Sequence, residues 1–173
     1  VTLDGDPQRS IVKKHEQDRE RWPQLQPLYQ VVPCTQLSSE RETLNLIRAM
    51  RNEDFDFIID TPGSLTQQGL LPLMFEADAI VTPFQMEKTS VNGTTAFMDM
   101  GIMVAKENGL DRLPPFYFLP NQFNKKWGRK NELTEQQEFL DYFAKLGTVL
   151  SKMPNSAEIQ RYSTLILTDK QHE

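Results

Sequence analysis

The sequence predicts an α/β protein with a mostly parallel sheet and helices on both faces of that sheet. Short apolar runs alternate with longer amphipathic or charged segments, and no low-complexity linker separates them. The run Phe57-Ile58-Ile59 is continuously apolar, which is typical of a strand covered on both faces. Alternation at this spacing implies parallel strands joined by right-handed crossovers. A length of 173 residues favours one domain over residues 1–173.

Each expected element has a local signal. The strands are apolar runs at residues 1–3, 29–32, 54–60, 79–83, 116–120 and 148–153. Helices are expected at residues 9–21, from a capping box at 39–42, from a cap at Thr66, at 88–108 before Gly109, and from a second capping box at 134–137 to Gly147.

Composition excludes several classes of protein. The net charge of −5 means that any contact with DNA must come from a local basic patch. The single cysteine, Cys34, rules out an intramolecular disulfide and fits a reducing cytoplasm. No apolar run in the sequence is long enough to span a membrane, and we expect no signal peptide. We therefore expect a cytoplasmic protein.

The organising stretch is residues 54–64, where a buried strand ends on a carboxylate. Asp60 is expected where the strand emerges at the carboxyl edge of the sheet, which is where open α/β sheets bind ligands. Pro62 and Gly63 then force a turn. A strand-end carboxylate beside such a loop suits a magnesium–nucleotide site. An Asp that only caps the following turn is the alternative on this stretch alone.

Other polar residues are expected at the same edge. Asp4 and Asp6 follow the first strand, and Asn121 follows the strand at residues 116–120. Acidic groups there can bind the water shell of magnesium or orient a nucleophilic water. The amide of Asn121 both donates and accepts hydrogen bonds, so it can read the edge of a base.

Three segments stand out together in this order: Asp4-Gly5-Asp6-Pro7-Gln8, residues 57–62 and residues 78–85. They resemble the ParA/MinD family of deviant Walker ATPases, and most closely short ParA-type proteins of plasmids and conjugative elements. The resemblance covers most of the chain and weakens after about Arg129. It implies a P-loop NTPase fold, with ATP and Mg²⁺ as cofactors.

The resemblance also implies roles for single residues. Asp6 would support attack of water on the γ-phosphate, and residues 61–67 would act as switch II. Asp60 would contact Mg²⁺ through water, and we place Asp4 in the same metal-facing group. Asn121 and Pro154 would lie on the adenine side of the nucleotide, and we add Gln8 to the nucleotide-contacting residues.

The chain departs from the family pattern in two ways. Arg9 stands where many relatives have glycine. No glycine- and lysine-rich phosphate loop occurs in the sequence, although the resemblance places one before Val1, after an interior strand. We therefore expect a single ATPase domain without its N-terminal strand and phosphate loop. One flank of the strand at 55–60 should then be unpaired, and this segment alone should bind ATP poorly.

By this resemblance the intact protein is expected to hydrolyse ATP in a magnesium-dependent, dimerising cycle for partition of plasmids, chromosomes or mobile elements. Its expected partners are a second copy, a ParB-like activator protein and nonspecific DNA, but no membrane. The best basic patch is Lys125, Lys126, Arg129 and Lys130, for which a solvated loop is the favoured interpretation.

Two alternatives stay open. One is a flavodoxin-like phospho-acceptor domain, against which Pro7, Pro62 and the chain length argue. The other is a non-catalytic interaction domain that has lost the phosphate loop.

Overall fold

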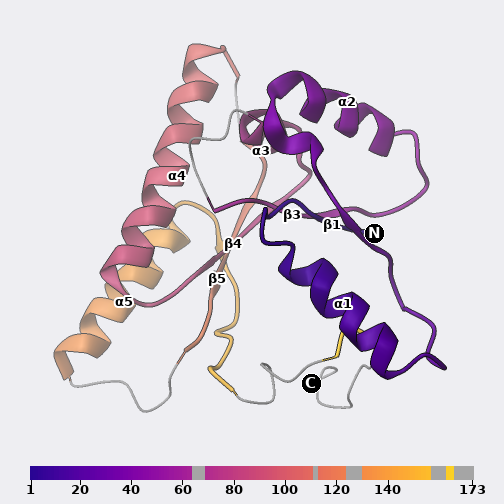
Figure 1. The fold of residues 1–173 in the computed structure, drawn as a ribbon. Coiled ribbons are helices and arrows are strands. Elements are labelled where there is room, and N and C mark those ends of the chain that lie inside the picture. The colour runs from indigo at the N-terminus through magenta and orange to yellow at the C-terminus, as the bar shows by residue number, and fades with distance from the viewer. Residues whose placement is uncertain (64–68, 111–112, 124–129, 157–162, 166–173) are drawn as a thin grey trace. The chain divides into compact units, whose positions relative to one another are not determined.

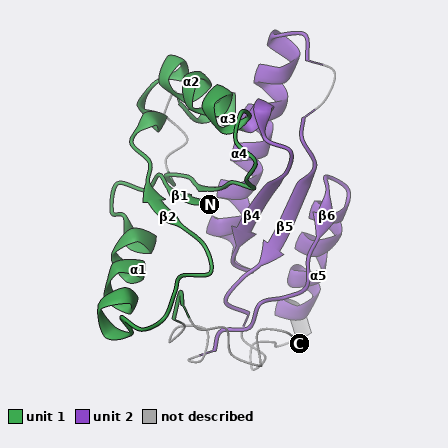
Figure 2. Ribbon diagram, turned by 90° about the vertical axis from the view of Figure 1, so that its right-hand side faces the viewer, with its two compact units in different colours: residues 1–73, 160–173 green, residues 74–159 purple. Residues whose placement is uncertain are grey.

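The computed structural model describes residues 1–63, 69–110, 113–123, 130–156 and 163–165. Clustering of contacts divides the chain into two compact units (Figure 2), Val1–Leu73 with Gln160–Glu173 and Met74–Ile159. Each unit is described by itself. The elements are β1 (Thr2–Asp4), α1 (Ser10–Arg21), β2 (Val31–Pro33), a 3₁₀ turn (Gln36–Ser38), α2 (Glu40–Met50), β3 (Ile58–Asp60), α3 (Leu70–Glu76), β4 (Ile80–Phe84), α4 (Lys88–Glu107), β5 (Phe116–Pro120), α5 (Lys130–Ala144) and β6 (Thr148–Val149).

The first unit is built on a parallel sheet with the strand order β2-β1-β3. In the register of β1 and β3, Leu3 lies opposite Ile59 and Asp4 lies opposite Asp60. Figure 1 shows α1 on one side of this sheet and α2 on the other. The core contains the buried side chains of Leu3, Cys34, Leu37, Ile47, Leu70 and Leu73.

The second unit is built on a parallel sheet with the strand order β4-β5-β6. Alternate residues of β5 are buried, so Phe116 and Phe118 face the core from the same side of the strand. Phe143 of α5 stacks on Phe118 with ring centroids 4.6 Å apart and contacts Phe84 at 4.7 Å. Met98 of α4 joins the same cluster, so α4 and α5 share one aromatic core.

The predicted α/β class and the parallel strands are confirmed. The strands at residues 116–120 and 80–84 match closely, whereas β3 and β6 are only three and two residues long. The described strands form two sheets, so the expected single sheet edge is not seen. The predicted start of the last helix at residues 134–137 was wrong, because α5 already begins at Lys130 and no residue before Thr134 interrupts it. The predicted cap at Thr66 lies outside the described residues.

Four of the described strands, β2, β3, β4 and β6, have one neighbour each, and β3 and β4 also expose apolar side chains. β3 pairs only with β1, and β4 pairs only with β5. Ile58 of β3 is 68% exposed and Val81 of β4 is 57% exposed, which is unusual for apolar residues in parallel strands. The open flank expected beside β3 is therefore present in this part of the chain. The strand expected to fill that flank, and the single-domain organisation, stay predictions.

The start of α1 depends on a buried carboxylate and a strained residue. Asp4 Oδ2 accepts hydrogen bonds from the backbone N–H groups of Ile11 and Val12, at 3.0 and 2.9 Å. These donors in the first turn have no partner within the helix. Arg9, immediately before α1, has φ 51° and ψ 47°, a left-handed conformation that favours glycine. A glycine at this position would adopt the same backbone conformation without the steric cost.

We expect Arg9→Gly to stabilise the protein by about 1 kcal/mol, because it removes the steric cost of a left-handed non-glycine residue. Lys13→Gly is the matched control, since it also removes one exposed cation but lies in the regular interior of α1. It should destabilise by about 1 kcal/mol. Urea unfolding of the two variants gives the comparison, and equal losses in both would show that Arg9 is not strained.

Candidate functional site

Asp4 is the last residue of β1, and its carboxylate accepts hydrogen bonds from backbone N–H groups. Its side chain is 1% exposed. Oδ2 accepts the two N–H groups of α1, and Oδ1 is 3.3 Å from the backbone N of Asp6. A buried carboxylate with three backbone donors has little capacity left for a ligand. The structure thus makes Asp4 the N-terminal cap of α1, and its predicted contact with metal stays untested.

Asp6 lies in the turn between β1 and α1, with one carboxylate oxygen used locally. Oδ1 accepts the backbone N–H of Gln8 at 2.7 Å, and the carbonyl of Asp6 accepts the N–H of Arg9 at 2.9 Å. This local bond fixes the turn and leaves Oδ2 with no hydrogen-bond partner among the described residues. Asp6 is half-buried and Gln8 is exposed. A half-buried carboxylate held this way can orient a water molecule.

Asp60 ends β3 next to the same turn. Its carbonyl accepts the N–H of Gly5 at 2.9 Å, which ties the Asp4–Asp6 turn to the end of β3. A Cβ at Gly5 would lie 2.4 Å from Leu37 Cδ1 and 2.8 Å from that carbonyl, so this close approach requires glycine. The turn and the strand end thus form one structural unit.

The three carboxylates influence one another electrostatically. Burial raises the pKa of Asp60, and the neighbouring charges of Asp4 and Asp6 raise it further. A bound cation would relieve this repulsion. Within the described part of the chain, however, no group of three or more His, Cys, Asp or Glu residues is arranged to hold a metal directly.

Asn121 and Pro154 come together in the second unit. Asn121 follows β5 and donates its backbone N–H to the carbonyl of Phe84 at 2.7 Å. Two residues later, Phe123 forms a parallel bridge with Pro154, which extends the pairing of β5 and β6. Pro154 thus lies beside the segment that follows Asn121, at the carboxyl end of the second sheet.

Sequence reasoning missed two glutamines near Asn121. Gln85 Nε2 donates to Gln122 Oε1 at 3.0 Å, and Asn121 Oδ1 accepts the backbone N–H of Gln122 at 2.8 Å. Gln122 has φ 54°, a rare conformation for a non-glycine residue and one often found at functional sites. The sequence signal that could have identified this group is the presence of carboxamide side chains directly after both strands, Gln85 after β4 and Asn121 with Gln122 after β5.

The predicted site residues therefore form two groups. Asp4, Asp6, Gln8 and Asp60 meet in the first unit, and Asn121 with Pro154 meets in the second. Most of the segment expected to act as switch II, and the basic residues Lys125, Lys126 and Arg129, lie outside the described residues. The side chain of Lys130 is likewise not described.

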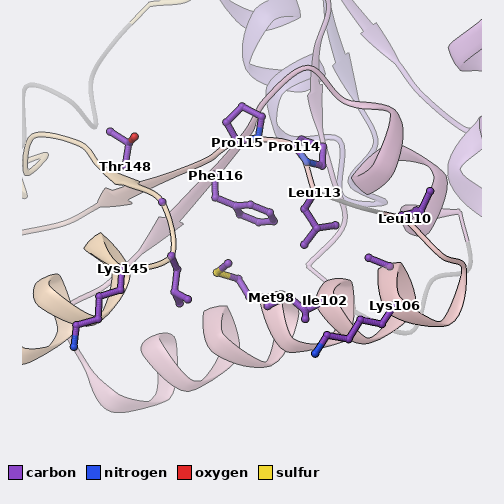
Figure 3. A pocket seen from close by; sticks show the side chains of 13 residues that line it. Met98, Ile102, Lys106, Leu110, Leu113, Pro114, Pro115, Phe116, Lys145 and Thr148 are labelled. Atoms are coloured by element: carbon purple, nitrogen blue, oxygen red, sulfur yellow. The ribbon is translucent and has the colours of Figure 1, made fainter.

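A cavity of about 510 Å³ lies elsewhere in the second unit, between α4 and the amino ends of β5 and β6 (Figure 3). Met98, Leu113 and Phe116 form its apolar lining, while Lys106 and Lys145 are at its margin. Since Phe116 begins β5 and Asn121 follows it, the cavity and the Asn121 group lie at opposite ends of this strand.

Comparison with solved structures identifies the fold. The chain is similar to the crystal structure of a plasmid partition protein from Borrelia burgdorferi, with a TM-score of 0.58 and 17% sequence identity. The match covers 95% of this chain and 81% of that one, and an iodide-soaked crystal of the same protein gives the same values. No protein-family model and no curated protein sequence matches the chain.

The fold is thus an α/β fold like that of a plasmid partition protein. At this identity the likeness establishes the fold and no activity. In the described residues, no helix combines the length and the apolar character that crossing a membrane requires.

We expect Asp60→Asn to stabilise the protein at neutral pH. Because the folded state raises the pKa of Asp60, the ionised carboxylate opposes folding at pH values above that pKa. The cost falls as pH falls through the folded pKa, and it is absent where the carboxyl is protonated in both states. Thermal unfolding at about pH 7 and about pH 3 should show a gain for Asp60→Asn only at the higher pH.

Asp54→Asn is the control for this experiment, because Asp54 is an exposed carboxylate outside β3. It should change the melting temperature little at either pH. Destabilisation by Asp60→Asn at neutral pH would contradict the repulsion among the three carboxylates.

Proposed function

We propose that the protein is a ParA-like ATPase that acts in DNA partition. The observation that carries this proposal is the pairing of Asp4 with Asp60 in β1 and β3, which places the Asp6 turn against the end of β3. The likeness of the fold to a plasmid partition protein supports the proposal independently of these residues. The resemblance in the segments that carry Asp6 and Asp60 then supplies the reaction class.

In this proposal the two carboxylates have different tasks. Asp60 would help to hold Mg²⁺, whose charge would offset the burial and the neighbouring carboxylates that raise the pKa of Asp60. Asp6 uses Oδ2 to orient the water that attacks the γ-phosphate. Asp4 contributes indirectly, because its hydrogen bonds to the first turn of α1 fix the position of that helix and of the turn that carries Asp6. When bound, Mg²⁺ supplies charge stabilisation to the phosphates.

The sequence resemblance assigns Asn121 and Pro154, both in the second unit, to adenine contacts. Asn121 Oδ1 accepts the backbone N–H of Gln122, and Asn121 Nδ2 has no hydrogen-bond partner among the described residues. It can donate to a ring nitrogen of adenine. Pro154 offers an apolar surface nearby, held by the bridge to Phe123. The phosphates require a glycine- and lysine-rich loop, which does not occur in residues 1–173, so the assays below use the intact protein.

The proposed cycle includes an ATP-dependent homodimer and a ParB-like activator protein. The dimer is also proposed to bind DNA without sequence specificity. Since the net charge is −5, that contact requires a local basic surface. These partners rest on the sequence resemblance and on the fold.

We expect Asp6→Ala in the intact protein to retain Mg·ATP binding and to lose turnover, by about 10²-fold or more. The contacts to phosphate and metal remain in this variant, while the positioning of water is lost. Isothermal titration gives the affinity and phosphate release gives the rate. Unchanged turnover would remove Asp6 from the mechanism.

Asp60→Asn tests the predicted metal contact in the same two assays, and Glu20→Gln is the control. Asp60→Asn should weaken binding of ATP in magnesium but leave the weaker binding without magnesium unchanged. Glu20→Gln, an exposed change on α1, should match wild type in both assays. If Asp60→Asn binds Mg·ATP as tightly as wild type, the metal assignment is wrong.

We expect the intact protein to dimerise when it binds a slowly hydrolysed ATP analogue in magnesium. Sedimentation velocity at tens of micromolar, an order-of-magnitude choice for affinities in the micromolar range, should show a dimer with the analogue and a monomer with ADP. A monomer under both conditions would contradict the proposed cycle.

A further inference from the structure

The last turn of α1 contains a buried carboxylate in an otherwise charged and exposed helix. Asp18 is 2% exposed and His15, one turn earlier, is 6% exposed. Burial of an ionised carboxylate is unfavourable unless it is paired and hydrogen-bonded. These two side chains therefore require partners, and neither belongs to the site described above.

The main partner is Thr164, which is 146 residues away in the sequence. Asp18 Oδ2 accepts both the backbone N–H of Thr164, at 2.7 Å, and its hydroxyl, at 3.0 Å. Oδ1 accepts Lys14 Nζ at 2.5 Å. Both oxygens of the carboxylate are thus satisfied by charge-assisted hydrogen bonds.

His15 completes the contact. Its Nδ1 lies 3.0 Å from Thr164 Oγ1. Because Thr164 gives its only hydroxyl proton to Asp18, Oγ1 accepts at this contact and His15 Nδ1 donates. Leu165, the next residue, is 5% exposed. Thr164 is therefore recognised through its N–H, its hydroxyl and the burial of the residue that follows it.

The charge states agree with this arrangement. Burial raises the pKa of Asp18, but the hydrogen bonds from Lys14 and Thr164 outweigh it, so the net pKa is lowered. Burial lowers the pKa of His15, and Arg19 lowers it further. At neutral pH the site therefore contains an anionic Asp18 and a neutral His15.

The helix that carries this contact is the one that Asp4 caps. Asp4 binds the N–H groups of Ile11 and Val12 at the start of α1, and Thr164 holds Asp18 in its last turn. An α-helix of 12 residues moves as a stiff element, so a constraint at one end affects the other.

We propose that Asp18 and His15 form a docking site on α1 for a threonine-containing segment, occupied by the chain's own Ser163–Leu165, and that this docking positions α1 and the Asp4–Asp6 turn. Asp18 and Thr164 are positioning residues in this scheme. The link to catalysis rests on the proposed ATPase function, whereas the docking and its effect on α1 do not.

Amide hydrogen exchange of the intact protein, without nucleotide, tests the proposal. Thr164→Val removes the hydrogen bond from the Thr164 hydroxyl to Asp18. The backbone amide of residue 164 should then exchange about tenfold faster or more. The amides of Ile11 and Val12 should also exchange faster, while Phe118 in β5 of the other unit should be unchanged. Thr164→Ser, which keeps the hydroxyl, should restore wild-type exchange at all of these positions.

The controls separate docking from general destabilisation. Asp18→Asn should reproduce Thr164→Val, whereas Glu20→Gln on the same helix and Thr89→Val on α4, both exposed, should match wild type. Exchange of Ile11 and Val12 at the wild-type rate in Thr164→Val overturns the positioning claim, and an unchanged amide at position 164 overturns the docking site.

The outcome is independent of the proposed function. Faster exchange at Ile11 and Val12 in a protein that binds no nucleotide would support the docking site and refute the ATPase. Conversely, wild-type exchange in a protein that hydrolyses ATP would refute the docking site alone. If both stand, Thr164→Val should lower kcat in phosphate release, and Thr164→Ser should recover it.

Discussion

The buried carboxylate of Asp4 is the constraint on which the first unit depends. It ends β1, caps α1 and lies opposite Asp60 in the parallel register. Removing its side-chain oxygens, as in Asp4→Ala, would leave backbone donors of α1 without a partner in a buried position, which costs about 1–3 kcal/mol per group. The same residue therefore determines where the helix begins and how the Asp6 turn meets β3. A site built on such a turn is only as well ordered as this cap.

The second unit is held by packing instead of by charge. Phe84, Phe118 and Phe143 are at most 2% exposed and contact one another as an aromatic cluster. Gly101 of α4 lies so close to Met74 that an added Cβ would be 2.0 Å from Met74 Cε. The carboxamides that follow β5 are thus attached to a close-packed support.

The class of fold was predictable because it depends on patterns that are local in sequence. Apolar runs predicted β4 and β5, and Ser39 with Glu42 predicted α2, where Ser39 Oγ accepts the N–H of Glu42. Element ends were harder, since a capping pattern at Thr134 contributes little against an uninterrupted helix. The division into two sheets was not foreseen, because periodicity does not reveal which strands become neighbours. The approach of the Asp4–Asp6 turn to Asp60 was predictable from the order of the motifs, whereas the contacts of Asp4 and Asp18 with α1 and Thr164 form only in the folded chain.

All strand pairs in the described residues are parallel, which affects how the chain reaches its fold. A parallel pair has no hairpin to form it locally, and the bond from Ile58 N to Val1 O joins residues 57 positions apart. Contacts of this kind form late, because the entropy of closing a long loop is lost before the contact contributes. The 20-residue α4, with its local hydrogen bonds, can form far earlier. During that interval the apolar Ile58 and Val81 lie on strands that still lack a neighbour, and nascent chains of this protein would depend on chaperones or on low concentration to avoid intermolecular β-pairing.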